Sequence, residues 1–134
     1  MTARPALAVA LLGAGLALAG CGSGDRPRPT PADGVRAAAN AYLGALGARD
    51  WQRACGLMTP AARRDLADAA GVPCPRALAA GGAEGAEELS SARRELAGAD
   101  VRIRGTAASI GPLGTAQQPL RLRRVGGRWL VAGA

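Results

Sequence analysis

The sequence predicts an α+β domain, with helices in the first two thirds of the chain and antiparallel strands in the last third. Two observations support this prediction. From about residue 31 to residue 97, apolar residues recur at helical spacing, whereas in residues 101–104 and 120–123 they alternate with arginine at every second position. Helices that precede strands in this way pack on one face of an antiparallel sheet.

The first twenty residues have the layout of a secretory signal. Arg4 supplies a short positive start, residues 5–19 are almost wholly Ala, Leu, Val and Gly, and small residues precede Cys21. The apolar stretch is too short to cross a bilayer, which needs about 20 residues. The sequence therefore predicts that residues 1–20 form a signal peptide, removed by cleavage before Cys21.

The cleavage site, Leu18-Ala19-Gly20-Cys21, resembles the lipobox of bacterial lipoproteins. The resemblance implies that the sulfur of Cys21 receives a diacylglycerol, so that acyl chains such as palmitate anchor the protein to the extracytoplasmic face of the cell membrane. Two or three chains would hold it stably, because each buried CH₂ contributes about 0.8 kcal/mol. The alternative is an ordinary secreted protein in which Cys21 merely follows the cleavage site.

A linker and a first helix come next. Residues 21–32 are predicted to hold the lipidated cysteine and a flexible linker, because Pro, Gly, Ser and charged residues leave little to bury. The helix begins with Thr30 as its N-cap, Pro31 in its first turn and Asp33 near the positive end of its dipole. It continues to about residue 47. Its apolar stripe consists of Val35, Ala38, Ala39, Tyr42, Leu43 and Leu46.

Two further helices follow from repeated start signals. Asp50 is the expected N-cap of a short second helix. Thr59 and Pro60 repeat the signal for a third helix, which Gly71 ends. The inward positions of the two helices are Trp51, Ala54, Cys55, Met58, Ala62, Leu66, Ala69 and Ala70.

The segment between the third helix and the first strand is less regular. Residues 73–75, Pro-Cys-Pro, predict a rigid turn that leads into one short turn of helix through residue 78. Residues 79–85 are small and Gly-rich, which predicts a mobile stretch. From residue 84 to residue 97, acidic residues come early and arginines late, the order that the dipole of a helix favours.

The strands carry a period of two. Residues 101–104 and 120–123 each alternate an aliphatic residue with arginine. Gly126 and Gly127 predict a two-residue hairpin turn, since such turns need positive φ, before a last strand over residues 128–131. Gly105 interrupts the phase of the first strand and predicts a bulge or bend there.

Composition limits the size of the domain and its choice of partner. Removal of residues 1–20 leaves 114 of the 134 residues, enough for one folded domain, which we expect over residues 33–134. The chain has no Phe, one Tyr and two Trp, so its core is small. All 17 basic residues are arginine, and loss of Arg4 lowers the net charge from +7 to +6. Such a charge favours anionic partners and says nothing about the fold.

The remaining cysteines form an even pair. Lipidation would remove Cys21 from redox chemistry and leave Cys55 and Cys74 in an oxidising compartment, which predicts a disulfide. The bond would close a loop of about 20 residues and contribute about 3 kcal/mol in the chain-entropy model. The alternative, a metal or redox pair, is disfavoured by the wide spacing and by the lack of histidine.

Several short segments, taken in order, resemble small actinobacterial lipoproteins with an NTF2-like (SnoaL-like) domain. They are Ala-Arg-Asp-Trp at 48–51, Ala-Cys-Gly-Leu-Met-Thr-Pro at 54–60, Cys-Pro at 74–75 and Gly-Gly-Arg-Trp-Leu-Val at 126–131. The resemblance implies three helices on a curved antiparallel sheet, a cone-shaped cavity between them, and a disulfide between Cys55 and Cys74. The strand region is shorter than is usual in that family, which implies a shallow or partly open cavity.

The chain lacks the usual parts of a catalytic site. Without histidine, Ser90 and Ser91 have no base for a Ser–His hydrolase, and neither a phosphate-binding loop nor a metal-ligand spacing occurs. Asp50 could lie near the cavity mouth, but an N-cap role explains it. Tyr42 could donate to a ligand, yet one tyrosine on an apolar helix face is more often part of the core. We therefore expect no catalytic residue, no metal and no cofactor.

Arginines dominate one face of the expected sheet. The aliphatic positions of the strands would face the helices: Val101, Ile103, Leu120 and Leu122. Four arginines would then project together from the other face, here named the basic face: Arg102, Arg104, Arg121 and Arg123. Arg124 and Arg128 would border it. Such a face can be merely solvated and oppose aggregation, or it can dock an anionic partner at about 1 kcal/mol per arginine near an anionic surface.

Together these features predict a membrane-anchored extracytoplasmic lipoprotein whose domain is a non-catalytic binding module of the cell envelope. Its partners would be the membrane, through lipid on Cys21, and an anionic envelope component or a protein. Nucleic acid is excluded, because export places the protein where nucleic acid is absent. The alternative is an NTF2-like enzyme of the isomerase or hydratase type with a small hydrophobic substrate.

Overall fold

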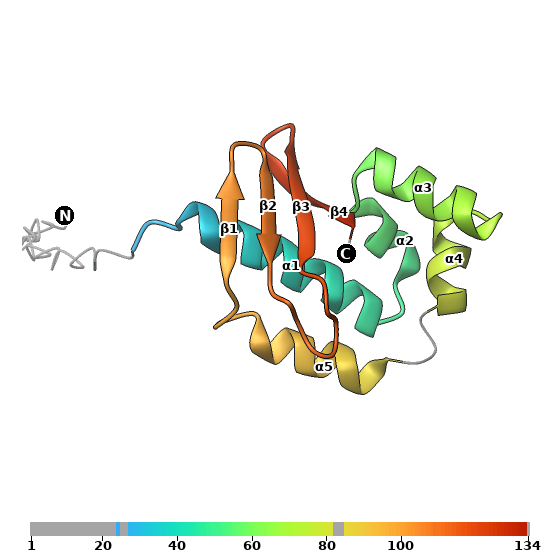
Figure 1. Ribbon diagram of the computed structural model, residues 1–134, viewed down its shortest axis with the longest axis horizontal. Coiled ribbons are helices and arrows are strands. Elements are labelled where there is room, and N and C mark those ends of the chain that lie inside the picture. The colour runs from blue at the N-terminus through green and yellow to red at the C-terminus, as the bar shows by residue number, and fades with distance from the viewer. Residues whose placement is uncertain (1–23, 25–26, 82–84, 134) are drawn as a thin grey trace, which may run out of the picture.

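A computed structural model describes residue 24 and residues 27–81 and 85–133, and it has the predicted α+β architecture (Figure 1). Five described helices pack on a four-stranded antiparallel sheet that is not closed. The predicted signal peptide and Cys21 lie outside the described residues. The elements are α1 (Pro31–Gly47), α2 (Trp51–Gly56), α3 (Pro60–Ala70), α4 (Cys74–Gly81), α5 (Ala86–Glu95), β1 (Val101–Arg104), β2 (Ala107–Ile110), β3 (Leu120–Val125) and β4 (Arg128–Gly133).

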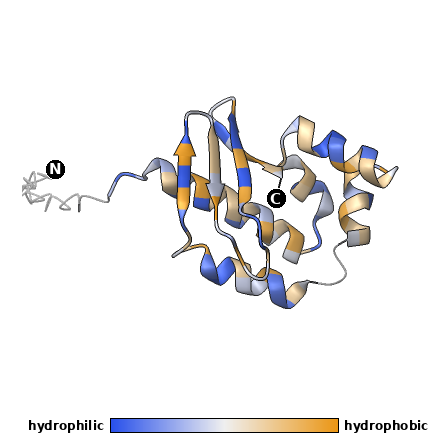
Figure 2. Ribbon diagram, in the orientation of Figure 1, coloured by the Kyte–Doolittle hydropathy of each residue, from blue (hydrophilic) through white to orange (hydrophobic). Residues whose placement is uncertain are grey.

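The helices form two groups around the sheet. Figure 1 shows α1 crossing one face of the strands, with α5 packed beside it, whereas α2, α3 and α4 lie together next to β4. Figure 2 shows the alternation of apolar and hydrophilic positions along β1 and β3 that identified these strands. None of the helices described is both long and apolar enough to cross a membrane.

The start of α1 is a capping box. The Oγ1 of Thr30 accepts a hydrogen bond from the backbone N–H of Asp33 (3.2 Å), and the carboxylate of Asp33 accepts one from the N–H of Thr30 (2.7 Å). The bond from the Thr30 backbone, followed by the bond from its hydroxyl, lowers the pKa of Asp33. Pro31 and Ala32 therefore already belong to the helix, two residues before the expected start of the domain.

The boundaries of α2 and α3 agree with the prediction, whereas the length of α4 does not. Asp50 and Thr59 cap α2 and α3 as expected, and Gly71 ends α3 with a φ of 66°. However, α4 spans eight residues instead of one short turn. Its start is stable because the carbonyl of Pro73 accepts from the N–H groups of Arg76 (2.9 Å) and Ala77 (3.0 Å) in the first turn, and Pro75 occupies a position where no N–H is needed.

The sheet is a meander in the order β1-β2-β3-β4. Gly105 does not mark a bulge: Arg104 pairs with Ala107, so Gly105 and Thr106 are the two central residues of a hairpin turn, and Gly105 has a φ of 59°. The interruption in phase thus separates two strands. The turn at residues 126–127 is confirmed, with φ values of 56° and 79°.

An irregularity lies between β3 and β4. Arg121 pairs with Gly133 and Leu122 pairs with Val131, which leaves Ala132 as an extra residue in β4. Such a bulge bends the strand and increases its twist. The outer edge of β4 is partly covered, since the N–H of Thr59 donates to the carbonyl of Val131 (2.8 Å).

Buried apolar residues form two clusters. The first joins α1, α5 and the sheet: Val35, Ala39, Leu43, Ala92, Leu96, Ala108, Ile110, Leu113 and Leu122. The second joins α2, α3, α4 and β4: Cys55, Met58, Ala62, Cys74 and Val131. Tyr42 and Leu120 are partly buried and pack against both clusters, so they mark the junction between them.

The predicted disulfide between Cys55 and Cys74 is present, with an S–S distance of 2.01 Å. It connects α2 to the first residue of α4 and lies within the second cluster. Residues 31–133 contain every described helix and strand, both clusters and the disulfide. A chain that begins at residue 22 therefore keeps the whole folded unit.

Candidate functional site

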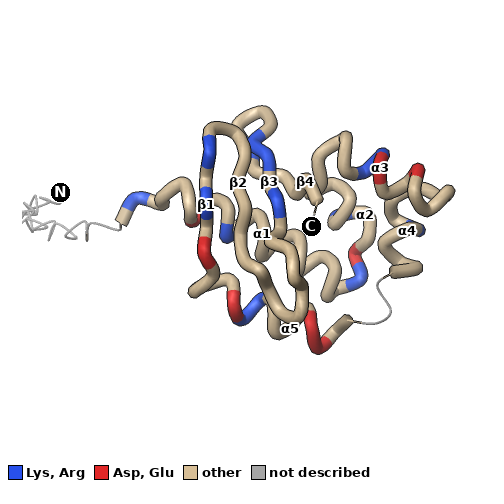
Figure 3. The backbone as a smooth tube through the Cα atoms, in the orientation of Figure 1, with Lys and Arg blue, Asp and Glu red and all other residues tan. Residues whose placement is uncertain are grey.

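Strand pairing brings the four arginines of the basic face together, as the alternation predicted. Arg102 and Arg121 flank Ser109 in one row, and Arg104 and Arg123 flank the next outward residue of β2 in a second row. All four side chains are exposed. Figure 3 shows the arginines as blue segments of β1 and β3.

Of three neighbouring expectations, two need correction. Ile103 does lie in the row that faces the helices, but it is 37% exposed because β1 is an edge strand. Arg124 follows Arg123 directly, so strand alternation turns it to the opposite face, where its Nε donates to the carbonyl of Gly127 (3.4 Å). Arg128 borders the basic face as expected, because it pairs with Val125, which lines the hollow formed by that face.

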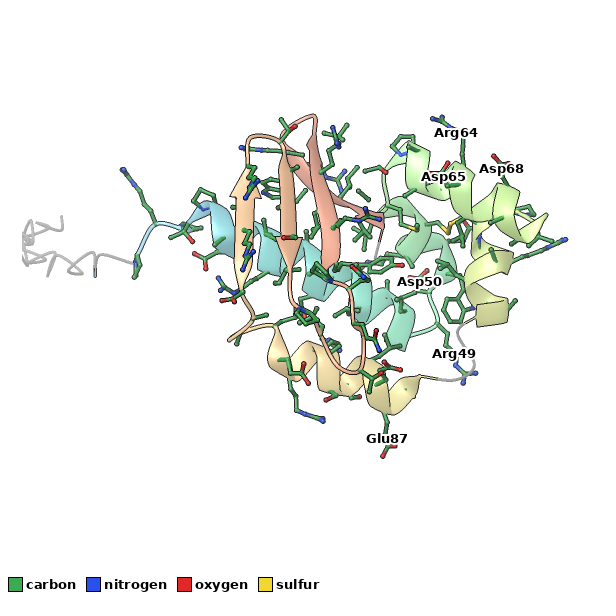
Figure 4. The ribbon with its side chains drawn as sticks, viewed as in Figure 1. Arg49, Asp50, Arg64, Asp65, Asp68 and Glu87 are labelled. Carbon is green, nitrogen blue, oxygen red and sulfur yellow. A yellow bond between two sulfur atoms is a disulfide. The ribbon has the colours of Figure 1, made fainter. Side chains whose placement is uncertain are left out.

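That hollow, here named the arginine groove, has a volume of about 910 Å³. One wall is the outer face of β1, β2 and β3, with the four arginines. The other wall is the start of α3, which adds Arg64 and Asp65 (Figure 4). Among the described residues, five arginines and a single acid line the groove.

The electrostatics of the arginine groove favour anions. Five guanidinium groups face one carboxylate, and the positive end of the α3 dipole points to the same space, because the first turn of α3 lines the groove. Thr59 caps this turn, its Oγ1 accepting from the N–H of Ala62 (3.2 Å). Arginine also matches the planar geometry of carboxylate and phosphate groups.

A second hollow, here named the apolar cavity, lies where the two hydrophobic clusters meet. Its volume is about 870 Å³, and its walls come from the five described helices, the loop before β3, and β3 with β4. Tyr42 and Leu120, the residues that contact both clusters, line it, together with Trp51. Most of the remaining wall is Leu, Ala and Met.

The two side chains considered for catalysis lie in different places. Tyr42 lines the apolar cavity, and burial raises the pKa of its hydroxyl. Asp50 is exposed at the turn between α1 and α2 (Figure 4), does not line the cavity, and accepts a hydrogen bond from the N–H of Arg53 (3.1 Å). Asp50 is therefore the helix cap that the sequence predicted.

Acids of α5 have a role that sequence patterns did not reveal. The carboxylate of Glu88 accepts a hydrogen bond from the hydroxyl of Thr115, and Glu95 accepts from the N–H of Gly114 (2.8 Å) and from the hydroxyl of Ser91 (3.0 Å). These contacts hold the loop before β3 against α5. The two partners in the loop, Gly114 and Thr115, lie 19 and 27 residues away in the chain, so no local motif indicates these contacts.

Comparisons with known proteins do not assign this domain. Comparison with models of protein families, with curated proteins and with solved structures yields no match. The likeness to NTF2-like lipoproteins thus rests on the sequence segments alone. Within the described part of the chain, no three His, Cys, Asp or Glu residues are grouped to hold a metal ion.

Proposed function

We propose that this protein is a membrane-anchored extracytoplasmic lipoprotein whose domain is a non-catalytic binding module that docks on an anionic component of the cell envelope. One observation carries the proposal: the four arginines of β1 and β3 lie on one face and line one groove. The lipobox-like site at Cys21 supports the location, and the NTF2-like resemblance supports a binding domain.

Membrane headgroups are the anionic surface nearest to such a domain. Nine residue steps separate Cys21 from Thr30, so the linker cannot place the start of α1 more than about 30 Å from the anchor. This tether keeps the basic face at high local concentration next to the bilayer. Exposed charges act over only about 8 Å at physiological salt, so docking needs this closeness.

Vesicle binding tests the docking. The chain from residue 22 onward, without lipid, should bind vesicles of phosphatidylglycerol and phosphatidylcholine, and it should not bind vesicles of phosphatidylcholine alone. Binding should weaken steeply with added salt, because exposed arginines supply it. Equal binding to both kinds of vesicle, or binding that ignores salt, would overturn electrostatic docking.

The anchor has its own test. Replacement Cys21→Ser should remove the lipid mass and release the protein from the membrane fraction at high salt, where the basic face is screened. A Cys21→Ser protein that still sediments with washed membranes would contradict lipid anchoring.

The alternative, an isomerase- or hydratase-type enzyme, is favoured by one observation, the apolar cavity with Tyr42 in its wall. A proton-transfer mechanism needs an acid and a base that both reach the substrate. Asp65 and Glu88 also line the cavity, and the carboxylate of Glu88 already accepts from Thr115. A binding module needs no such acid and base, because the apolar walls and the arginines are sufficient for binding. We therefore prefer the binding module.

A further inference from the structure

The sheet has one edge that is available to another chain, here named the open edge, which is the outer side of β1 (Val101–Arg104). The strand order places β1 at the end of the sheet, with β2 as its single neighbour (Figure 1). The opposite end is already in use. There the N–H of Val131 donates to the carbonyl of Leu57 (2.9 Å), and the carbonyl of Val131 accepts from the N–H of Thr59 (2.8 Å).

The ladder between β1 and β2 shows which backbone groups reach the open edge. Just before β1, the carbonyl of Asp100 accepts from the N–H of Gly111 (3.1 Å), so the backbone of Asp100 faces β2. Successive residues of a strand turn their backbone groups to opposite sides. Arg102 therefore also bonds to β2, whereas the N–H and C=O groups of Val101 and Ile103 point out of the sheet. Among the described residues, none bonds to these four groups.

The side chains of the open edge differ between its two faces. In the row that faces the helices, Ile103 is 37% exposed, because no further strand covers it. On the other face, Arg102 and Arg104 are both exposed, and neither forms an ion pair or a side-chain hydrogen bond with a described residue. Asp100 belongs to the same row but lies before the strand. Within the strand itself the charge is therefore wholly positive.

A second copy of this chain does not fit the open edge. If Val101 of one copy paired with Ile103 of the other, the two Arg102 side chains would lie directly opposite each other and repel. A register that sets Asp100 opposite Arg102 needs the backbone of Ala99. The C=O and N–H of Ala99 already form hydrogen bonds within the chain (3.1 Å and 3.4 Å). Charge on an edge strand opposes self-pairing in this way, but it favours a strand of opposite charge.

We infer that the open edge binds an extended acidic segment of a partner protein, which adds to the sheet as a further antiparallel strand. The segment places acidic residues opposite Arg102 and Arg104 and aliphatic residues in the row of Ile103. The backbone groups of Val101 and Ile103 supply affinity, and the side chains supply specificity. The inference goes beyond the proposed membrane docking, because it uses the edge of the sheet and gives the chemistry of a protein partner.

Synthetic peptides test the added strand. A short peptide that alternates glutamate with valine should bind the chain from residue 22 saturably in isothermal titration calorimetry, whereas a peptide that alternates lysine with valine should not bind. N-methylation of the valines, whose N–H groups face β1 in the antiparallel register, should abolish binding. N-methylation of the glutamates, whose N–H groups face away, should preserve it. Equal binding of the glutamate and lysine peptides, or equal effects of the two methylations, would overturn the inference.

Amide hydrogen exchange locates the contact on the protein. The glutamate peptide, at about ten times its dissociation constant, should slow exchange about tenfold at Val101 and Ile103. Ile103→Pro removes one edge N–H without removing a bond to β2, as edge strands tolerate, and should weaken peptide binding. The control Ile103→Val keeps the N–H and should bind the peptide. Unchanged exchange at both amides in the unaltered chain would overturn strand addition, whether or not the proline variant folds.

Two arginine variants of equal charge separate the open edge from the rest of the basic face. Arg102→Gln should weaken binding of the glutamate peptide about two- to fivefold, the loss of one cross-strand pair of opposite charges. Arg123→Gln acts on β3, about 10 Å further from the added strand, and should change peptide binding less than about twofold. Both variants should weaken binding to phosphatidylglycerol vesicles. Equal weakening of peptide binding by the two would overturn the placement at β1.

Strand addition and membrane docking fail separately. Vesicle binding without peptide binding would overturn strand addition alone, and peptide binding without vesicle binding would overturn membrane docking alone. Sedimentation tests the other occupant, a second copy. The chain from residue 22 should be monomeric at the concentrations of the peptide titration. A dimer that Ile103→Pro dissociates would assign the open edge to a second copy and overturn the acidic partner.

Discussion

Arg36 shows how a charged side chain can serve the fold instead of the surface. From the side of α1 its Nε donates to the carbonyl of Leu96 (3.2 Å), and its Nη2 donates to the carbonyl of Ala99 (3.1 Å). Both carbonyls follow the last residue of α5, and the carbonyl of Leu96 also accepts from the N–H of Ala99 (3.4 Å), so Arg36 ties α1 to the segment that follows α5. The partners lie about 60 residues apart in sequence, so the pattern of α1 alone could not indicate this role.

Replacement Arg36→Met should lower the free energy of unfolding by about 2 kcal/mol, because two hydrogen bonds from a charged group are lost while the aliphatic stem is kept. Urea unfolding measures the change. The control Arg94→Met removes an exposed arginine of α5 and should change stability by less than about 0.5 kcal/mol. Equal stability of the two variants would show that the Arg36 contacts contribute nothing.

Replacement of glycine by alanine should have opposite effects on stability at two positions. Gly44 lies inside α1, where an added Cβ would meet the guanidinium of Arg93 no closer than 3.8 Å, so Gly44→Ala should stabilise by about 0.5–1 kcal/mol. Gly111 has a φ of 102°, and a Cβ there would lie 2.9 Å from the backbone N of Leu113. Gly111→Ala should therefore destabilise by more than about 1 kcal/mol. Thermal unfolding of both variants checks the signs, and a stabilised Gly111→Ala chain would contradict the described loop.

Stability at alkaline pH should follow Tyr42. Burial raises the pKa of Tyr42 above its ordinary value of 10.0, so the folded chain holds its proton to higher pH than the unfolded chain does. This contribution is complete below pH 10 and is lost as pH rises through the folded pKa. Urea unfolding should show the loss, and Tyr42→Phe should abolish that part of the pH dependence. Retention of the same alkaline decline in the Phe variant would assign it to another group.

At the scale of elements, helix starts were predictable because their signals are local. Thr30, Asp50 and Thr59 each bond to an N–H within three residues, and such short-range geometry follows from sequence alone. The length of α4 was not predicted, because its Ala-rich residues gain from packing near the disulfide as well as from propensity. Gly105 was misread since one glycine with a broken phase fits a bulge and a hairpin equally well.

The disulfide should matter most to the group of α2, α3 and α4. The double variant Cys55→Ala, Cys74→Ala opens a loop with a sequence separation of 19, which predicts a loss of about 3 kcal/mol. Chemical unfolding measures it, and reduction of the native chain is the matched control, since it opens the loop without altering the side chains. A double variant as stable as the oxidised chain would show that packing alone holds these helices.

At the scale of the whole molecule, the basic face was predictable and its surroundings were not. Alternation along β1 and β3 placed Arg102 and Arg123 on one face. Strict alternation would also have excluded Arg124 from that face, because Arg124 directly follows Arg123. The start of α3, as the second wall of the groove, depends on how α3 packs beside β4. The apolar cavity depends on the meeting of two clusters at Tyr42, which periodicity within one helix cannot show.

The central claim is that the position of these arginines, and not the total charge, directs the domain to an anionic surface. A matched pair of quadruple variants tests it most directly. One replaces the basic face, Arg102, Arg104, Arg121 and Arg123, by serine. The other replaces four exposed arginines that line neither hollow, Arg28, Arg53, Arg76 and Arg94, by serine.

Both variants lose the same charge, so only position differs. Partition of each chain onto phosphatidylglycerol vesicles is the deciding measurement. At about 1 kcal/mol per arginine near an anionic surface, loss of the basic face should lower the partition coefficient by about two to three orders of magnitude, whereas the control should stay within about tenfold of the unaltered chain. Equal losses in the two variants would contradict a docking face and leave only the net charge.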